Sequence, residues 1–154
     1  MDLLQRIYDE IVAYGVDNVV KEIDLTRHLA GRLGGEAEKG RVDITVDGKT
    51  IELKLAQPYM SKSRYTEGVL SLFKKHMFDL NGHNSALHDL VHKRPDYFVL
   101  LLYYHDGHPL PTGSVERLMD EAPDYEGHEF EILDNPDLLQ VNGKMRMVGF
   151  ERRP

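Results

Sequence analysis

Apolar residues recur every three or four positions through the first 33 residues of the chain. This spacing predicts two helices, one over residues 2–14 and one over about 16–33. Glycines interrupt both patterns, at Gly15 and at Gly34, and glycine is the residue that most often follows a helix C-terminus. The polar segment 36–40 is then expected to be a loop.

Two short runs of alternating apolar residues follow, over 41–46 and 50–55. The Asp-Gly dipeptide at 47–48 between them is among the strongest sequence signals for a two-residue hairpin turn. Such a turn fixes the pairing of the two strands residue by residue. It places Asp43 opposite Glu52 on the polar face of the hairpin, with β-carbons about 5 Å apart.

The remainder of the chain alternates between helical and strand-like patterns. The most apolar run, 97–104, predicts a strand that is buried on both faces. The other predicted elements are helices over about 62–80, 85–92 and 114–121 and strands over 129–133, 138–141 and 145–150. The sequence therefore predicts a single α/β domain over 1–154, with a central mixed β-sheet flanked by helices.

Composition narrows the class of protein. The 154 residues include no cysteine, which excludes disulfides and thiolate metal sites. No apolar run is long enough to span a bilayer, and the charged start does not resemble a signal peptide, so a soluble cytoplasmic protein without membrane contact is expected. The net charge of -7 argues against nucleic-acid binding through overall charge. Nucleic-acid binding would need a local basic patch, or a metal ion that cancels the charge of carboxylates.

The electrostatic repulsion between the two opposed carboxylates of the hairpin must be compensated. In one interpretation, water, salt and the nearby Arg41 and Lys54 screen Asp43 from Glu52. In the other, a divalent cation lies between them, because Mg²⁺ prefers oxygen ligands and commonly uses one or two carboxylates. Lys54 is on the same face, where its ammonium group can hold an attacking water or stabilise charge on a phosphate.

Asp43, eight intervening residues and then Glu52-Leu53-Lys54 resemble the core signature of the PD-(D/E)XK nuclease superfamily. Its members have the restriction-endonuclease-like fold, with the Asp on one strand of a central hairpin and the acid-x-Lys triplet on the next. A helix precedes that hairpin, and another helix leads from it to a further core strand. The predicted order of elements agrees over 1–104 and leaves 105–154 as a C-terminal elaboration. Val42 stands where the superfamily name has proline.

The resemblance implies a Mg²⁺-dependent endonuclease that hydrolyses nucleic-acid phosphodiester bonds, with DNA as the expected substrate. Mn²⁺ is expected to substitute for Mg²⁺. Asp43 and Glu52 would be metal ligands, the backbone carbonyl of Leu53 would join them, and Lys54 would assist the attacking water.

Five further residues are weaker candidates for the same site. In the superfamily a glutamate of the N-terminal helix often contributes, and Glu22 is the first candidate and Glu10 the second. Gln57 has a spacing after the lysine that some branches share, although an ordinary polar residue at a strand end explains it equally well. Lys62 and Arg64 are candidates for phosphate contacts, and a solvated helix face explains them at least as well.

Two other functions stay open on sequence grounds. The chain could keep the nuclease-like fold without cleaving, as a binding or assembly module, and a protein partner would then supply the basic contacts that an acidic chain lacks. It could also be an unrelated α/β domain that binds a protein or a small ligand. A homodimer would suit a nuclease that cuts two strands, but no dimer surface can be identified from the sequence.

Overall fold

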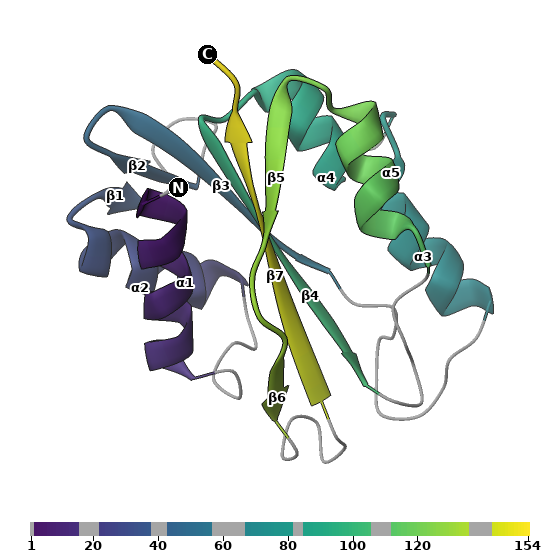
Figure 1. Cartoon of the computed structure of the whole chain (residues 1–154), viewed down its shortest axis with the longest axis horizontal. Helices are drawn as coiled ribbons and strands as arrows, with labels where there is room; N and C mark the ends of the chain where they lie inside the picture. Colours follow the sequence, from purple (N-terminus) through teal and green to yellow (C-terminus); the bar gives the residue numbers. More distant parts are fainter. Residues whose placement is uncertain are drawn as a thin grey trace.

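The computed structural model describes residues 2–15, 22–37, 43–56, 67–81, 85–105, 112–135 and 143–154. In these residues a mixed β-sheet of seven strands lies between two groups of helices (Figure 1). One face is covered by α1 (Asp2–Tyr14) and α2 (Glu22–Leu33), and the other by α3 (Glu67–Phe78), α4 (Ala86–His88) and α5 (Ser114–Glu121). None of the described helices is both long enough and apolar enough to cross a membrane.

The sheet is assembled from strands that are distant in sequence. The strands are β1 (Glu36–Ala37), β2 (Ile44–Val46), β3 (Lys49–Ala56), β4 (Tyr97–His105), β5 (Tyr125–Glu129), β6 (Leu133–Asn135) and β7 (Gly143–Arg152). Their order is β1-β2-β3-β4-β7-β5, and β6 also pairs with β7. The pair β3–β4 is parallel, which requires the crossover through α3 and α4, and the other pairs are antiparallel.

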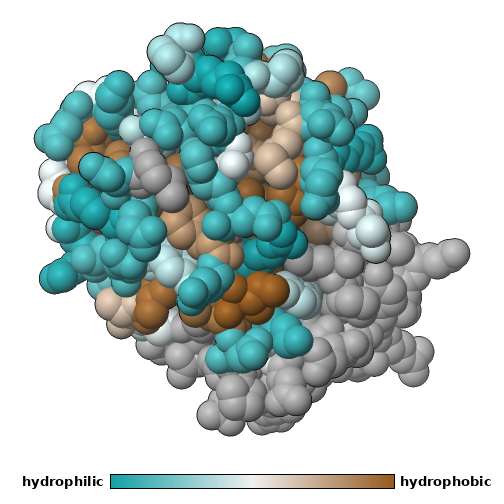
Figure 2. Space-filling view, in the orientation of Figure 1, coloured by the Kyte–Doolittle hydropathy of each residue, from teal (hydrophilic) through white to brown (hydrophobic). Residues whose placement is uncertain are grey.

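Two apolar clusters hold the layers together, one on each face of the sheet. The cluster under α1 and α2 includes Leu4, Ile11, Leu29, Ile51 and Leu53. The cluster under α3, α4 and α5 includes Phe73, Leu87, Phe98, Leu118 and Phe150. The outer surface is mostly polar on the side that Figure 2 shows, with smaller apolar areas between the polar groups.

The central strand β4 contributes to both clusters. All residues from Phe98 to Leu102 have 0% exposure, so the predicted burial on both faces is confirmed. Predicted and observed bounds also agree for α1 and α5, and β7 is slightly longer than the predicted strand 145–150.

Several predicted elements differ from the structure or extend beyond its described part. The predicted helices 16–33 and 62–80 are described from Glu22 and from Glu67 onward, and their earlier residues lie outside the described part. The segment 36–40, expected to be a loop, contains the two-residue strand β1. The predicted strand 129–133 is wrong, because β5 ends at Glu129 and β6 begins at Leu133. The predicted helix 85–92 changes after α4 into a π-helical segment, η2 (Asp89–Lys93). The predicted strand 138–141 lies outside the described residues.

Candidate active site

The hairpin has the turn and register that its sequence predicts. Asp47 and Gly48 have φ angles of 48° and 76°, which is the left-handed backbone of the turn type that matches the twist of paired strands. Ile44 is paired with Ile51, and both lie in the cluster under α1 and α2. Because side chains alternate along a strand, Glu52 points to the opposite face, toward α3 and α4.

Reciprocal hydrogen bonds extend the hairpin beyond its last backbone pair. The Asp43 N–H donates to Glu52 Oε1 at 3.1 Å, and the Leu53 N–H donates to Asp43 Oδ2 at 2.8 Å. Each carboxyl group is thus anchored by the backbone of the other strand. The two acidic groups lie close together, as the predicted register requires.

Glu52 is buried to an unusual degree for a carboxyl group. Its relative exposure is 2%, and a charge without water around it is costly. Burial is the main reason that the pKa of Glu52 is raised to about 8, and the charge of Asp43 adds to the effect. Bulk water therefore cannot screen the repulsion between the Asp43 and Glu52 carboxylates on the side of the buried Glu52.

Asp89 and Lys93 of η2 complete this cluster, and sequence reasoning missed both. The Lys93 ammonium donates to Glu52 Oε2 at 3.3 Å and lies 3.6 Å from Asp89 Oδ1. The side chain of Asp89 is 6% exposed and that of Lys93 is 28% exposed. An acid and a base four residues apart share one side of a helix, which was the only signal available in the sequence.

The local backbone explains why these two side chains point to the sheet. Ser85 caps α4, accepting a hydrogen bond from the His88 N–H at 3.0 Å and donating to the Asp79 carbonyl at 2.8 Å. The segment then widens into η2, in which the Arg94 N–H donates to the Asp89 carbonyl. Widened turns of this kind occur frequently at functional sites.

The charges of the cluster act on one another. Burial raises the pKa of Asp89, and Lys93 and Lys54 oppose this rise. Burial lowers the pKa of Lys93, but Glu52 and Asp89 outweigh burial, so this pKa is raised overall. The cluster brings three carboxyl groups together with two ammonium groups, an arrangement with more acidic than basic groups.

The other predicted residues have different positions. Glu10 accepts a hydrogen bond from Arg32 at 3.0 Å between α1 and α2, which cover the opposite face of the sheet from Glu52. Glu22 begins α2, but its side chain is outside the described part of the structure, as are Gln57, Lys62 and Arg64. Lys54 is half-buried, and its charge helps to lower the pKa of His76, after burial.

The described residues do not contain a ready-made metal site. No group of three or more His, Asp and Glu side chains within them has an arrangement that would hold a metal ion. His88 and His92 share a helix face with ring centroids 4.6 Å apart, and His88 Nδ1 lies 3.9 Å from Asp89 Oδ1. Metal binding at the carboxyl cluster would therefore require Lys93 to move.

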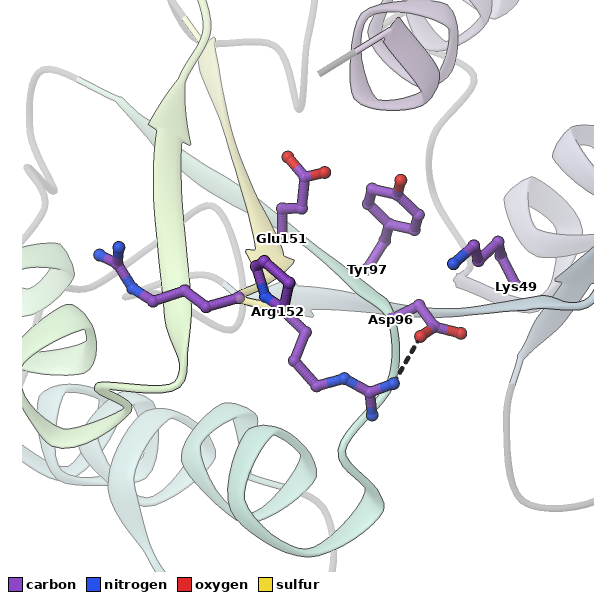
Figure 3. Close-up of a pocket in the computed structure, with 7 residues that line it drawn as sticks. Lys49, Asp96, Tyr97, Glu151 and Arg152 are labelled. Carbon is purple, nitrogen blue, oxygen red and sulfur yellow. Dashed lines mark hydrogen bonds and ion pairs between the residues drawn. The ribbon is translucent and has the colours of Figure 1, made fainter.

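A separate open pocket of about 310 Å³ lies where β3 and β4 begin and β7 ends. Figure 3 shows Tyr97 and Glu151, from neighbouring strands, side by side in this pocket, and the ion pair between Arg152 and Asp96. The other oxygen of Asp96 accepts hydrogen bonds from the backbone and the hydroxyl of Thr50. Asp96 thus connects the start of β4 to β3 and β7, which is a structural role.

Comparisons of the chain with protein-family models, curated proteins and solved structures find no match. The fold class that the structure shows is α/β with a mixed sheet between helices. A function must therefore be inferred from the carboxyl cluster itself.

Proposed function

We propose that this protein is a metal-dependent nuclease that hydrolyses phosphodiester bonds of nucleic acid, with DNA as the expected substrate. The observation that carries the proposal is the burial of the Glu52 carboxyl group beside Asp43. A buried acid and a half-buried acid, each held by a backbone N–H of the other strand, are compensated best by a cation between them. A strongly raised pKa in a buried acidic cluster is also typical of functional sites.

The donor set suits Mg²⁺ or Mn²⁺. Asp43 and Glu52 offer hard carboxylate oxygens, and backbone N–H groups hold both side chains in place. When bound, the ion would polarise a phosphate oxygen and lower the pKa of a bound water. Lys54 projects from the same face of β3 as Glu52, where its ammonium group can hold a phosphate oxygen or the attacking water.

The order of elements supports the same proposal. Two helices precede the hairpin, α3 follows it, and β4 then pairs in parallel with β3. This is the arrangement that the resemblance to the PD-(D/E)XK superfamily implies, and we include a restriction-endonuclease-like fold in the proposal. In that fold, β3 would carry both the acid and the lysine of the triplet.

The direct test is a panel of labelled DNA and RNA, single-stranded, duplex and branched, incubated with Mg²⁺, Mn²⁺ or EDTA. We expect cleavage that requires the divalent ion and that falls by about 100-fold or more in Asp43→Asn and Lys54→Met. Asp124→Asn, which removes an exposed acid paired with Arg94, is the control. Cleavage that persists in Asp43→Asn would contradict the proposal.

One observation favours the second candidate, a nuclease-like module that binds or assembles without cleaving. Lys93 already supplies a cation to Glu52, and the net charge of -7 suits a chain whose protein partner provides the basic contacts. For this function we expect no cleavage of any substrate in the panel, even where Mn²⁺ binds at the hairpin. Divalent-ion-dependent cleavage that Asp43→Asn abolishes would exclude it.

A further inference from the structure

Asp89 has an oxygen whose surroundings are unusual for a buried acid. The residue is 4% exposed, and its Oδ1 accepts no hydrogen bond within the described part of the chain. Lys93 Nζ lies 3.6 Å from this oxygen and His88 Nδ1 lies 3.9 Å from it. A buried carboxylate oxygen without a hydrogen bond is costly, so a native structure that keeps one calls for an explanation.

The Lys93 ammonium group links this oxygen to the hairpin. Lys93 Nζ lies 3.3 Å from Glu52 Oε2 and 3.6 Å from Asp89 Oδ1, so carboxylates from β3 and from η2 converge on one cation. The charge of Asp43 also acts on Asp89, which places the third acid of the cluster within electrostatic reach. The three acids come from the hairpin and from the crossover that follows it.

We propose that Asp89 is a further ligand for the divalent ion of the hairpin site, and that Lys93 is the cation that occupies this position in the metal-free protein. The inference rests on the proposed function, because it assigns residues to the same metal site. Asp89 would contribute its Oδ1 to the ion. Lys93 would withdraw its ammonium group when the ion binds.

The environment of Lys93 is compatible with this exchange. Its side chain is 28% exposed, whereas those of Glu52 and Asp89 are 2% and 6% exposed. A lysine has a flexible stem that can carry its charge from a buried partner to water. The Glu52 carboxylate would stay in place while the ammonium group moves, because Glu52 also accepts the backbone hydrogen bond from Asp43.

Calorimetric titration of the full chain with Mn²⁺, without nucleic acid, tests the inference independently of cleavage. We expect Asp89→Asn to weaken binding by about tenfold or more. We expect Lys93→Met to strengthen binding by about fivefold, because the competing cation is gone. The opposite signs are decisive, since loss of a purely structural ion pair would disturb the site in the same direction from either partner.

A second ion pair in the chain provides matched controls. Arg117 and Glu121 are also four residues apart, at 3.3 Å, but they are exposed on α5. Glu121→Gln and Arg117→Met should leave Mn²⁺ binding unchanged. Thermal unfolding of each variant with and without Mn²⁺ shows whether the variant is folded. If Asp89→Asn alone does not fold, the double variant Asp89→Asn/Lys93→Met removes both charges together. The double variant should still bind more weakly than Lys93→Met.

The outcomes separate the inference from the function on which it rests. If Asp43→Asn abolishes Mn²⁺ binding while Asp89→Asn binds like the wild type, the hairpin site stands and the role of Asp89 is overturned. Weaker binding in both Asp89→Asn and Lys93→Met would overturn the exchange. A wild-type chain that binds no Mn²⁺ would remove the proposed function and the inference together.

Discussion

Replacement of Glu52 by glutamine should change how stability depends on pH. Each tenfold change in proton binding is worth about 1.4 kcal/mol, so a pKa raised from 4.5 to about 8 corresponds to about 5 kcal/mol between the protonated and ionised forms. Because Glu52 is 2% exposed, little of this is screened by water. Glutamine has nearly the same shape and removes the ionisation.

The sign follows from the direction of the pKa change. The folded chain binds the Glu52 proton more tightly than the unfolded chain, so this group contributes stability fully below about pH 4.5 and loses it as pH rises to about 8. Wild-type protein should therefore lose up to about 5 kcal/mol of unfolding free energy over this range from Glu52 alone. Glu52→Gln should lose much less and be the more stable protein at about pH 9.

Urea denaturation between about pH 5 and pH 9, in EDTA to keep metal away, measures this difference. The neighbouring Asp43, Lys54, Asp89 and Lys93 remain in both proteins, so the difference between the two profiles reports mainly on Glu52. Glu121→Gln, at an exposed acid, is the control and should run parallel to the wild type. Parallel profiles for Glu52→Gln and wild type would refute the reasoning that burial raises the pKa of Glu52.

Four further substitutions test the fold by urea denaturation at one pH. Gly35→Ala would push its Cβ against the carbonyl oxygen of Thr45 and should lower the free energy of unfolding by about 1–3 kcal/mol. Gly31→Ala, with open space around it inside α2, should raise the free energy of unfolding by up to about 1 kcal/mol. Equal effects would contradict the close approach at Gly35. Phe98→Ala should cost about 3–5 kcal/mol, because Phe98 is fully buried between β4 and the helices, and a loss below 1 kcal/mol would argue against that packing. Asp96→Ala should cost about 1–3 kcal/mol, because Thr50 and Arg152 lose their shared acceptor, and an unchanged midpoint would deny Asp96 its structural role.

The hairpin could be predicted because its information is local. An Asp-Gly pair favours the left-handed backbone that the turn needs, and alternation then assigns each residue to a face. The position of Asp43 beside Glu52 follows from that register without reference to the rest of the chain. The central strand β4 could be predicted equally well, because a strand buried on both faces has a continuous apolar run in its sequence.

Other features depend on contacts that a sequence does not display. Asp89 and Lys93 reach the site only because the crossover packs against the face of β3 that carries Glu52. The strand β5 was misplaced because, among the described strands, it pairs with β7 alone and buries one side chain, Tyr125, so it shows no apolar alternation. At Gly127 a side chain would meet Met119, a requirement that appears only once α5 is in place.

The position of β7 has a consequence for how the chain reaches its structure. This strand, residues 143–152, lies between β4 and β5, and it is also the partner of β6. During synthesis, β4 therefore leaves the ribosome before the strand that covers its second edge. Until residues 143–152 emerge, an apolar strand with an unpaired edge is exposed, which is a site for association between chains. The hairpin with Asp43 and Glu52 is complete early, but the sheet beside it closes only when β7 is inserted.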